Sequence, residues 1–508
     1  MMTTTAASPE FDTTFASLPD RFYSYAQPVT VANATTIIHN PTLAKELGID
    51  PQWLASDEAL QVLAGNQTAL GSAPMAQAYA GHQFGSFNPQ LGDGRAHLLG
   101  EIVTPNGERF DLQLKGSGPT PYSRRGDGRS PMGPVIREYL ISEAMAALGV
   151  PTTRSLAAIA TGETVMRQGP APGAVLTRIA PSHIRVGTFE YFAMQGDEDA
   201  VKKLADYCLK RHCPHLINHA QPYLALLNEV MERQAKLIAQ WQGFGFIHGV
   251  MNTDNMLICG ATVDYGPCAF MDQFNPEKVF SSIDRLGRYR YNQQPGIGQW
   301  NLTRLAQALL PLLHTDGEQA LADAQQALDD YVKHFGAAYQ RVMSNKLGFS
   351  EPQADDQALT EQLLAIMAEH QLDFTLCFRY LLDQVAVQVT DLVADLVKTG
   401  PAHQALGDAF TAPDELVLWQ QQWQRRLATD SQSQEQRYQQ MKLANPAFIA
   451  RNHQVELAIR AAEDNGDYEP FYALLKVLQT PFEYQQSLKG YALTPMPLEV
   501  VHHTFCGT

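Results

Sequence analysis

A change in residue pattern along the chain constrains its fold more than any other feature. From about residue 81 to 180, glycine and proline are dense, and short segments alternate between apolar and polar residues, which is typical of strands and turns. After about residue 190, apolar residues recur at helical spacing, as in a long helix that we expect to end at Gly243. A polar loop-and-strand stretch, 245–274, interrupts the helices. This order predicts an α+β fold in which a strand-rich part precedes a helical part.

The alternation is strictest just after a Pro-Asn-Gly turn signal at 105–107. We therefore expect Ala96–Val103 and Arg109–Lys115 to pair as antiparallel strands, with Leu112 and Leu114 facing the core. The segment 134–148 follows, with apolar residues every three or four positions and a proline in its first turn. It predicts a helix directly after the strand-rich segment.

Size and charge narrow the class of protein. The chain has 508 residues, which is more than one hydrophobic core usually serves, so we expect two or three packed units. Its 37 Lys and Arg against 53 Asp and Glu give a net charge of −16, which argues against a general nucleic-acid binder. Six cysteines are too few for a disulfide scaffold. Without a long apolar run or a signal-like start, the chain is expected to be cytoplasmic with no membrane partner. We expect a monomer, although the sequence does not state the oligomeric state.

Three segments carry residue types that suit phosphate and Mg²⁺. Lys115 ends the second predicted strand, and Glu138 lies on the predicted helix. The third segment runs from His248 to Leu257 and is followed by Asp264-Tyr265-Gly266. A lysine fixed by a glutamate presents positive charge to phosphate, and carboxylate and amide oxygens are ligands that Mg²⁺ prefers. Taken singly, such residues are more often solvated surface or turn residues.

The third segment resembles the catalytic and metal-binding loops of protein kinases. Asn255 matches the metal-binding asparagine and Asp264 matches the aspartate of Asp-Phe-Gly, so the resemblance implies a two-lobed kinase-like fold. Lys115 and Glu138 match the strand lysine and helix glutamate of that fold. The catalytic aspartate of kinases is replaced by Val250, which cannot accept a hydroxyl proton. The nearest carboxylate is that of Asp254.

The surrounding sequence resembles the selenoprotein O family, also called YdiU. The resemblance covers nearly the whole chain and is carried by four segments and the ending: 79–85 (Tyr-Ala-Gly-His-Gln-Phe-Gly), 90–95 (Gln-Leu-Gly-Asp-Gly-Arg), 114–118 (Leu-Lys-Gly-Ser-Gly), 122–129 (Tyr-Ser-Arg-Arg-Gly-Asp-Gly-Arg) and 506–508 (Cys-Gly-Thr). Members are similar to kinases in fold but are adenylyltransferases. The resemblance implies a pseudokinase that binds ATP in a flipped orientation and transfers AMP to Ser, Thr or Tyr hydroxyls of proteins.

The same resemblance implies a role for each matching residue. Asp254 is the expected proton acceptor, and Asn255 and Asp264 are the expected ligands of Mg²⁺, for which Mn²⁺ can substitute. The residues expected to contact the nucleotide or its phosphates are Gly92, Gly94, Arg95, Lys115, Asp127, Gly128, Glu138, Arg178, Arg185 and Asp264. Two alternatives remain open: a kinase that transfers the γ-phosphate with Asp254 as base, and a non-catalytic nucleotide-binding scaffold.

The resemblance also suggests how the chain is divided. We expect an N-terminal extension packed on the core over 1–80, a kinase-like N-lobe over 81–190, a C-lobe with the catalytic and metal loops over 191–400, and a helical region over 401–508. Some members carry selenocysteine near the position of Cys506, where it takes part in a regulatory disulfide. The sequence does not say whether Cys506 does so here, or whether Cys259 or Cys268 would be its partner.

Overall fold

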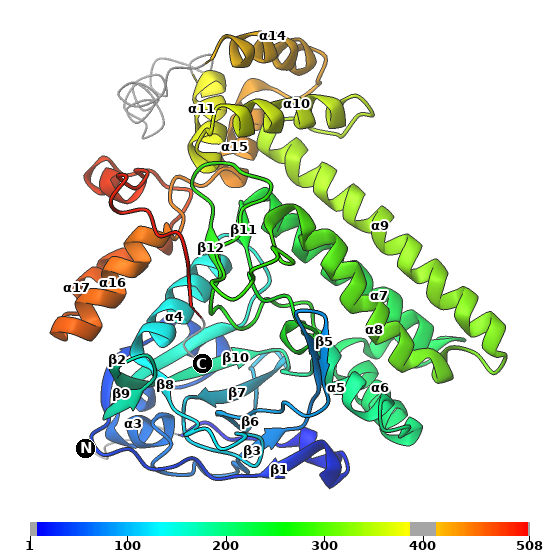
Figure 1. Ribbon diagram of the computed structural model, residues 1–508, viewed down its shortest axis with the longest axis vertical. Helices are drawn as coiled ribbons and strands as arrows, with labels where there is room; N and C mark the ends of the chain where they lie inside the picture. Colours follow the sequence, from blue (N-terminus) through cyan, green and yellow to red (C-terminus); the bar gives the residue numbers. More distant parts are fainter. Residues whose placement is uncertain (1–7, 387–412, 506–508) are drawn as a thin grey trace.

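The structure is a computed structural model that describes residues 8–386 and 413–505. It has an antiparallel sheet built mainly from the first 180 residues and a helical part built from most of the rest (Figure 1). The predicted α+β class and its order, strands first and helices after, are therefore confirmed. Cys506 lies outside the described residues.

The main sheet is formed by strands from both the first 80 residues and the segment that follows. Its order is β1-β3-β6-β7-β10-β9-β2, and β8 pairs with β10 beside this path. The strands are β1 (Tyr23–Tyr25), β2 (Thr35–His39), β3 (Met75–Gln77), β6 (Ala96–Val103), β7 (Arg109–Lys115), β8 (Ser130–Pro131), β9 (Arg154–Met166) and β10 (Pro170–Ala180). Short helices α1 (Pro41–Leu47), α2 (Pro51–Leu54) and α3 (Asp57–Leu63) lie between β2 and β3.

The predicted hairpin is present with the predicted bounds. Strands β6 and β7 pair antiparallel from Val103 opposite Arg109 to Ala96 opposite Lys115. The turn places Gly107 at φ 84°, a left-handed conformation that glycine adopts without steric cost. Leu112 and Leu114 are fully buried in the core beneath the sheet, as the alternation predicts.

Helix α4 (Met132–Ala147) packs against β9 and β10 and occupies the segment where a helix was predicted. It begins two residues before the predicted start because extended Pro131 caps it and Met132 joins the buried core. After its C-cap, Leu148, the left-handed Gly149 (φ 76°) turns the chain, and the Val150 N–H donates to the Met145 carbonyl.

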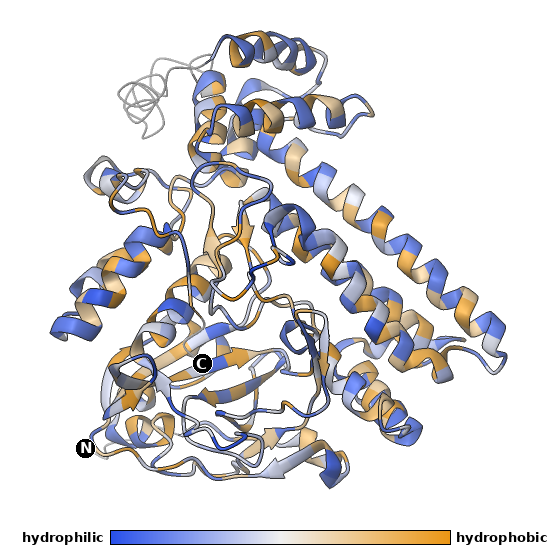
Figure 2. Cartoon of the chain, viewed as in Figure 1, coloured by the Kyte–Doolittle hydropathy of each residue, from blue (hydrophilic) through white to orange (hydrophobic). Residues whose placement is uncertain are grey.

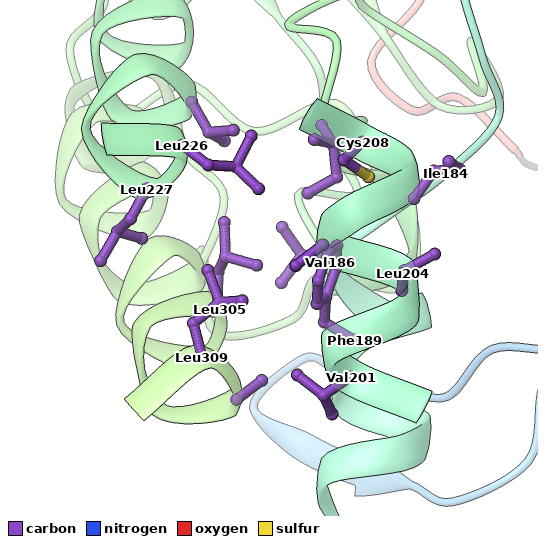
Figure 3. Packing of buried hydrophobic residues seen from close by; sticks show 14 of the residues in the cluster. Ile184, Val186, Phe189, Val201, Leu204, Cys208, Leu226, Leu227, Leu305 and Leu309 are labelled. Carbon is purple, nitrogen blue, oxygen red and sulfur yellow. The ribbon is translucent and has the colours of Figure 1, made fainter. Parts of the chain in front are cut away.

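Long helices pack side by side in the middle of the chain. They are α5 (Val186–Ala193), α6 (Glu198–His212), α7 (Pro222–Gly243), α8 (Gln294–Leu313) and α9 (Gly317–Leu347). Helix α7 ends at Gly243, as predicted. Figure 3 shows buried apolar side chains between these helices, with Leu226, Leu305 and Leu309 of α7 and α8 on one side and Val186, Phe189 and Val201 of α5 and α6 on the other.

Between α7 and α8 the chain forms the predicted loop-and-strand stretch. It contains the pair β11 (Phe246–Ile247) and β12 (Ala269–Phe270) and the single turn η4 (Thr253–Asn255). A second small hairpin, β4 (Gly81–Gln83) with β5 (Ser86–Asn88), lies outside the main sheet. It contacts both η4 and α5, so it covers the loop that follows β11.

The last described helices form two groups. One contains α10 (Asp356–Glu369), α11 (Phe374–Ala386), α14 (Asp414–Ala428) and α15 (Gln434–Ala444), and the other contains α16 (Asn452–Asn465) and α17 (Glu469–Leu478). The second group packs on α4, and the Tyr472 hydroxyl donates to the Ile37 carbonyl of β2. Further on, Thr504 pairs with Ser281 in a parallel β-bridge, so the tail returns to the loop after β12.

Hydrophobic and hydrophilic residues are mixed around the long helices (Figure 2). Among the described residues, no helix is both long enough and apolar enough to cross a bilayer.

Candidate active site

A cavity of about 630 Å³ lies between the sheet, α4 and the loops that follow β11. All twelve residues predicted from the sequence line it: Gly92, Gly94, Arg95, Lys115, Asp127, Gly128, Glu138, Arg178, Arg185, Asp254, Asn255 and Asp264. Segments separated by up to about 170 residues are thus brought to one place. A cavity of this size is within the range of small-molecule and cofactor sites.

Lys115 and Glu138 form the expected ion pair. Lys115 is the last residue of β7, on the face opposite Leu114, and Glu138 lies in the second turn of α4. The Lys115 ammonium donates to Glu138 Oε2 at 2.7 Å and to Asp264 Oδ1 at 2.9 Å. Because α4 packs on the sheet, its glutamate reaches the end of the strand and fixes the lysine toward the cavity.

Two buried arginines join the same cluster. Arg178 of β10 donates from Nε to Glu138 Oε1 at 2.8 Å and from Nη2 to Asp264 Oδ1 at 2.7 Å. Arg185, the residue before α5, donates from Nη1 to Asp264 Oδ2 at 2.7 Å and to the Asp254 carbonyl. Three cations therefore face two carboxylates, which leaves one positive charge in excess at this wall of the cavity.

The arginines and the lysine decide the protonation of both carboxylates. Burial alone would raise the pKa of Asp264, but the charges of Arg178, Lys115 and Arg185 outweigh it and hold that pKa well below its usual value. Burial likewise opposes ionisation of Glu138, and Arg178 and Lys115 still lower its pKa. Both groups are charged near neutral pH, and the cluster is a fixed array of charges.

Asp264 has a backbone conformation that few residues other than glycine adopt. Its φ is 63°, in the left-handed region, which aspartate tolerates better than most side chains do. This conformation turns its carboxylate toward Lys115, Arg178 and Arg185 while the next residue, Tyr265, is fully buried. Strain of this kind is concentrated at functional sites.

Asp254 differs from the other two carboxylates because it makes no ion pair in the described part of the chain. Gln83 donates from Nε2 to its Oδ2 at 3.0 Å, whereas its buried Oδ1 has no hydrogen-bond partner among the described residues. Burial raises the pKa of Asp254 to about 6, against an ordinary value of 3.8. A carboxylate with an oxygen that has no hydrogen-bond partner and with a raised pKa is suited to accept a proton.

The loop around Asp254 is held by backbone contacts. The Val250 carbonyl accepts hydrogen bonds from the Asn252 N–H and from Asn255 Nδ2 at 3.0 Å, and the Val250 side chain lines the cavity. His248 is fully buried, with Nε2 at 2.8 Å from the Val263 carbonyl and its ring stacked on Trp241. The histidine therefore holds the backbone of the loop in place.

The glycine-rich segments form the opposite rim. Gly92 has φ 64°, and a Cβ there would lie 2.3 Å from the Tyr122 ring. Gly128 has φ 64° and packs on the backbone of Gly118, where a Cβ would approach to 2.1 Å. Both positions therefore require glycine. Asp127, half exposed at this rim, accepts two hydrogen bonds from Arg167, at 2.8 and 2.9 Å.

The oxygens of Asp264 and Asn255 fit a divalent cation. A carboxylate offers about four acceptor positions, and Asp264 uses two on Oδ1 and one on Oδ2, so one remains. Asn255 uses its amide nitrogen on Val250, which leaves its amide oxygen for a ligand. Within residues 8–386 and 413–505 no group of three or more His, Cys, Asp and Glu side chains is arranged to hold a metal. An asparagine–aspartate site that the nucleotide completes does not need such a group.

Comparison with known proteins identifies the family. A family model described as "Protein adenylyltransferase SelO" matches residues 6–479 of this chain. The chain belongs to the SelO family. A protein named "Protein nucleotidyltransferase YdiU" from Rhodopseudomonas palustris (strain BisB18) is 53% identical over 498 residues, covering 98% of this chain and 99% of the relative. A protein of the same name from Methylorubrum populi is 51% identical over 503 residues, covering 98% and 99%.

The family membership confirms the resemblance seen in the sequence and makes this chain a protein nucleotidyltransferase. In this SelO-family protein the structure also brings residues to the site to which sequence reasoning gave no role. Gln83 holds Asp254, and the ring of Tyr79 lies 4.8 Å from the Arg185 guanidinium. Both belong to the segment 79–85 on which the family resemblance partly rests, and that segment is the signal that could have pointed to them.

Proposed function

We propose that this protein transfers AMP from ATP to Ser, Thr or Tyr hydroxyls of other proteins and releases pyrophosphate. The hydroxyl oxygen attacks the α-phosphorus, the bond from that phosphorus to the bridging oxygen of the β-phosphate breaks, and the hydroxyl proton passes to Asp254. The observation that carries the proposal is the free, buried Oδ1 of Asp254 in a cavity where Val250 replaces the kinase base.

A flipped ATP is the orientation that the charge distribution supports best. Lys115, Arg178 and Arg185 form the most cationic wall of the cavity and are suited to hold the terminal phosphates. The α-phosphate is then directed toward Asp254, and the arginines stabilise the charge that develops on the leaving pyrophosphate. Mg²⁺ held by Asn255 and Asp264 would supply further positive charge at the phosphates. The rim glycines Gly92 and Gly128 allow the close packing on Tyr122 and Gly118 that shapes this side of the cavity.

We also infer a kinase-like division of the chain. The strands β6 to β10 and α4 correspond to the N-lobe over 81–190, to whose sheet the extension 1–80 adds β1, β2 and β3. The helices and the loops after β11 correspond to the C-lobe over 191–400, and 401–508 follows it. The Lys115–Glu138 pair at 2.7 Å, with Asp264 at 2.9 Å from the same ammonium, supports this division. In kinases the equivalent groups assemble the nucleotide site in the same way.

The test uses ATP labelled on the α-phosphate in one reaction and on the γ-phosphate in another, with Mg²⁺ and a mixture of acceptor proteins. We expect label on protein from the α position only. Label from the γ position only would indicate the alternative kinase. Binding of ATP without transfer of either label would indicate the non-catalytic scaffold.

Two variants test the site within that assay. Asp254→Asn should reduce AMP transfer by about 10²- to 10⁴-fold and leave ATP binding intact, since it removes the proton acceptor without changing shape. Asp264→Ala should abolish transfer and also weaken Mg²⁺-dependent ATP binding. The exposed Asp199→Ala is the control for both. Wild-type transfer by Asp254→Asn would contradict the assignment.

A further inference from the structure

Two arginines and a tryptophan form a cluster beside the proposed proton acceptor. Arg288 lies in the loop that leads to α8, and Trp300 and Arg304 lie one turn apart on α8. Each guanidinium carbon is 4.7 Å from the Trp300 ring centroid. Stacking on an aromatic ring orients a guanidinium and leaves its N–H edge available to an anion.

Neither arginine is neutralised by the protein. In the described part of the chain no carboxylate lies within ion-pair distance of Arg288 or Arg304, and Nε of each is buried without a hydrogen-bond partner. Arg290, two residues away in the same loop, does pair with Glu277 at 3.0 Å. A half-buried guanidinium without an anionic partner is unfavourable, and two of them stack on one indole in a chain that is otherwise acidic.

Two neighbouring carboxylates bind other groups of the protein, although the buried Oε2 of Glu190 has no hydrogen-bond partner among the described residues. Asp284 accepts hydrogen bonds from the backbone N–H groups of Arg288 at 2.9 Å and Tyr289 at 2.8 Å. Glu190 of α5 pairs with the His82 ring. The cluster therefore lacks an internal counterion although acidic residues lie close by.

The β4–β5 hairpin connects the cluster to Asp254. Gln83 of β4 donates to Asp254, and a Cβ at Gly85 would lie 3.5 Å from the guanidinium carbon of Arg288. His82 donates its backbone N–H to Thr253 Oγ1 at 2.7 Å, and its ring meets Trp300 edge-on at 5.2 Å. None of Arg288, Trp300 and Arg304 lines the 630 Å³ cavity. The cluster thus lies next to the proton acceptor but apart from the proposed nucleotide site.

We propose that Arg288, Trp300 and Arg304 bind a carboxylate of the acceptor protein, from an Asp or Glu close in sequence to the hydroxyl that receives AMP. This inference rests on the proposed function, because it names the substrate class of the same site. Each guanidinium presents the paired N–H groups that a carboxylate accepts, and their position next to the hairpin that holds Asp254 would direct the neighbouring hydroxyl toward it. The protein would therefore select acidic segments of its substrates.

The experiment measures AMP transfer from α-labelled ATP to two serine peptides that differ only in flanking Glu or Gln residues. For the wild type we expect a KM about tenfold lower for the Glu peptide, which is the size expected for a charge-assisted hydrogen bond. Arg288→Gln and Arg304→Gln should each remove this preference by raising the KM for the Glu peptide, with kcat and the KM for ATP little changed. Arg290→Gln is the matched control, because its guanidinium is already paired.

A charge-reversal variant gives a second test, in which the preference between peptides is expected to change sign. Arg304→Glu should disfavour the Glu peptide and prefer one flanked by Lys, a switch that a merely structural role would not produce. Equal KM values for the Glu and Gln peptides with the wild type, or label on whole proteins but on neither peptide, would overturn the inference and leave the proposed function standing. Absence of α-label on any acceptor, peptide or protein, would overturn both.

Discussion

Among single residues, Lys346 has an unfavourable environment for its charge. It is buried near the end of α9, with its ammonium 4.2 Å from the Phe378 ring centroid and 5.7 Å from those of Phe244 and Phe374. Burial lowers the pKa of Lys346 to about 7, against an ordinary value of 10.5. The aromatic rings compensate for part of the lost hydration.

Lys346→Met should stabilise the protein below neutral pH. Between pH 7 and 10.5 the unfolded chain binds a proton that folded Lys346 does not, so wild-type stability rises with pH across this window. The gain from methionine is therefore largest near pH 6, at roughly 2 kcal/mol once the aromatic contacts are allowed for, and disappears toward pH 10.5. Denaturant unfolding of both proteins at several pH values measures it. A gain that does not depend on pH would contradict the assignment.

The sequence predicted the candidate site residues that belong to local motifs, but not which side chains those residues contact. Lys115, Glu138 and Asp264 could be predicted because their spacing matches a known arrangement. Arg178 and Arg185 both contact Asp264 because of the register between β10 and β7 and the place where α5 begins. No local sequence pattern predicts either of these two features. The cluster of Arg288 and Arg304 was missed for the same reason, since only the fold brings their segments together.

At the level of elements, the β4–β5 hairpin positions the proton acceptor. Gly81 contacts the Asp254 side chain so closely that a Cβ there would lie 2.4 Å from Oδ1 and 2.9 Å from Asp254 Cβ. Gly81→Ala should therefore displace Asp254 and reduce kcat for AMP transfer by about 10²-fold, with ATP binding retained. Gly296→Ala, where a Cβ meets nothing within 4 Å, is the control. Equal activity of the two variants would show that the hairpin does not position Asp254.

The elements themselves were predictable to different degrees. The β6–β7 hairpin has the predicted bounds because a turn signal and strict alternation both lie within twenty residues. The start of α4 was predicted two residues late because the burial of Met132, a tertiary contact, extends the helix. Strands β1, β2 and β3 were not identified, since each is short and its pairing with distant strands decides its conformation.

On the scale of the whole molecule, Arg451 joins segments that are far apart in the sequence. Its guanidinium binds Asp272 and Asp373 Oδ2, the latter at 2.9 Å, and donates from Nε to the Ala492 carbonyl at 3.1 Å. Arg451 is fully buried, so its loss would leave two carboxylates without their partner. The loop after β12, the start of α11 and the C-terminal segment are held together at this point.

Arg451→Met should lower the free energy of unfolding by about 3–5 kcal/mol, the usual cost of breaking a buried ion pair from one side. Arg460→Met, which removes exposed pairs on α16, should change it by less than about 1 kcal/mol. Denaturant titration of the three proteins measures both changes. Similar losses for the two variants would indicate that Arg451 contributes no more than a surface arginine.

The bond from Tyr472 to Ile37 and the bridge from Thr504 to Ser281 set the order in which a nascent chain can fold. Strand β2 cannot pair until β9, more than a hundred residues later, has left the ribosome, and α17 reaches β2 later still. The loop after β12 gains its last partner only when the final residues emerge. Contacts this distant slow folding and leave strand edges exposed during synthesis, so we expect a stalled or shortened chain to need a chaperone.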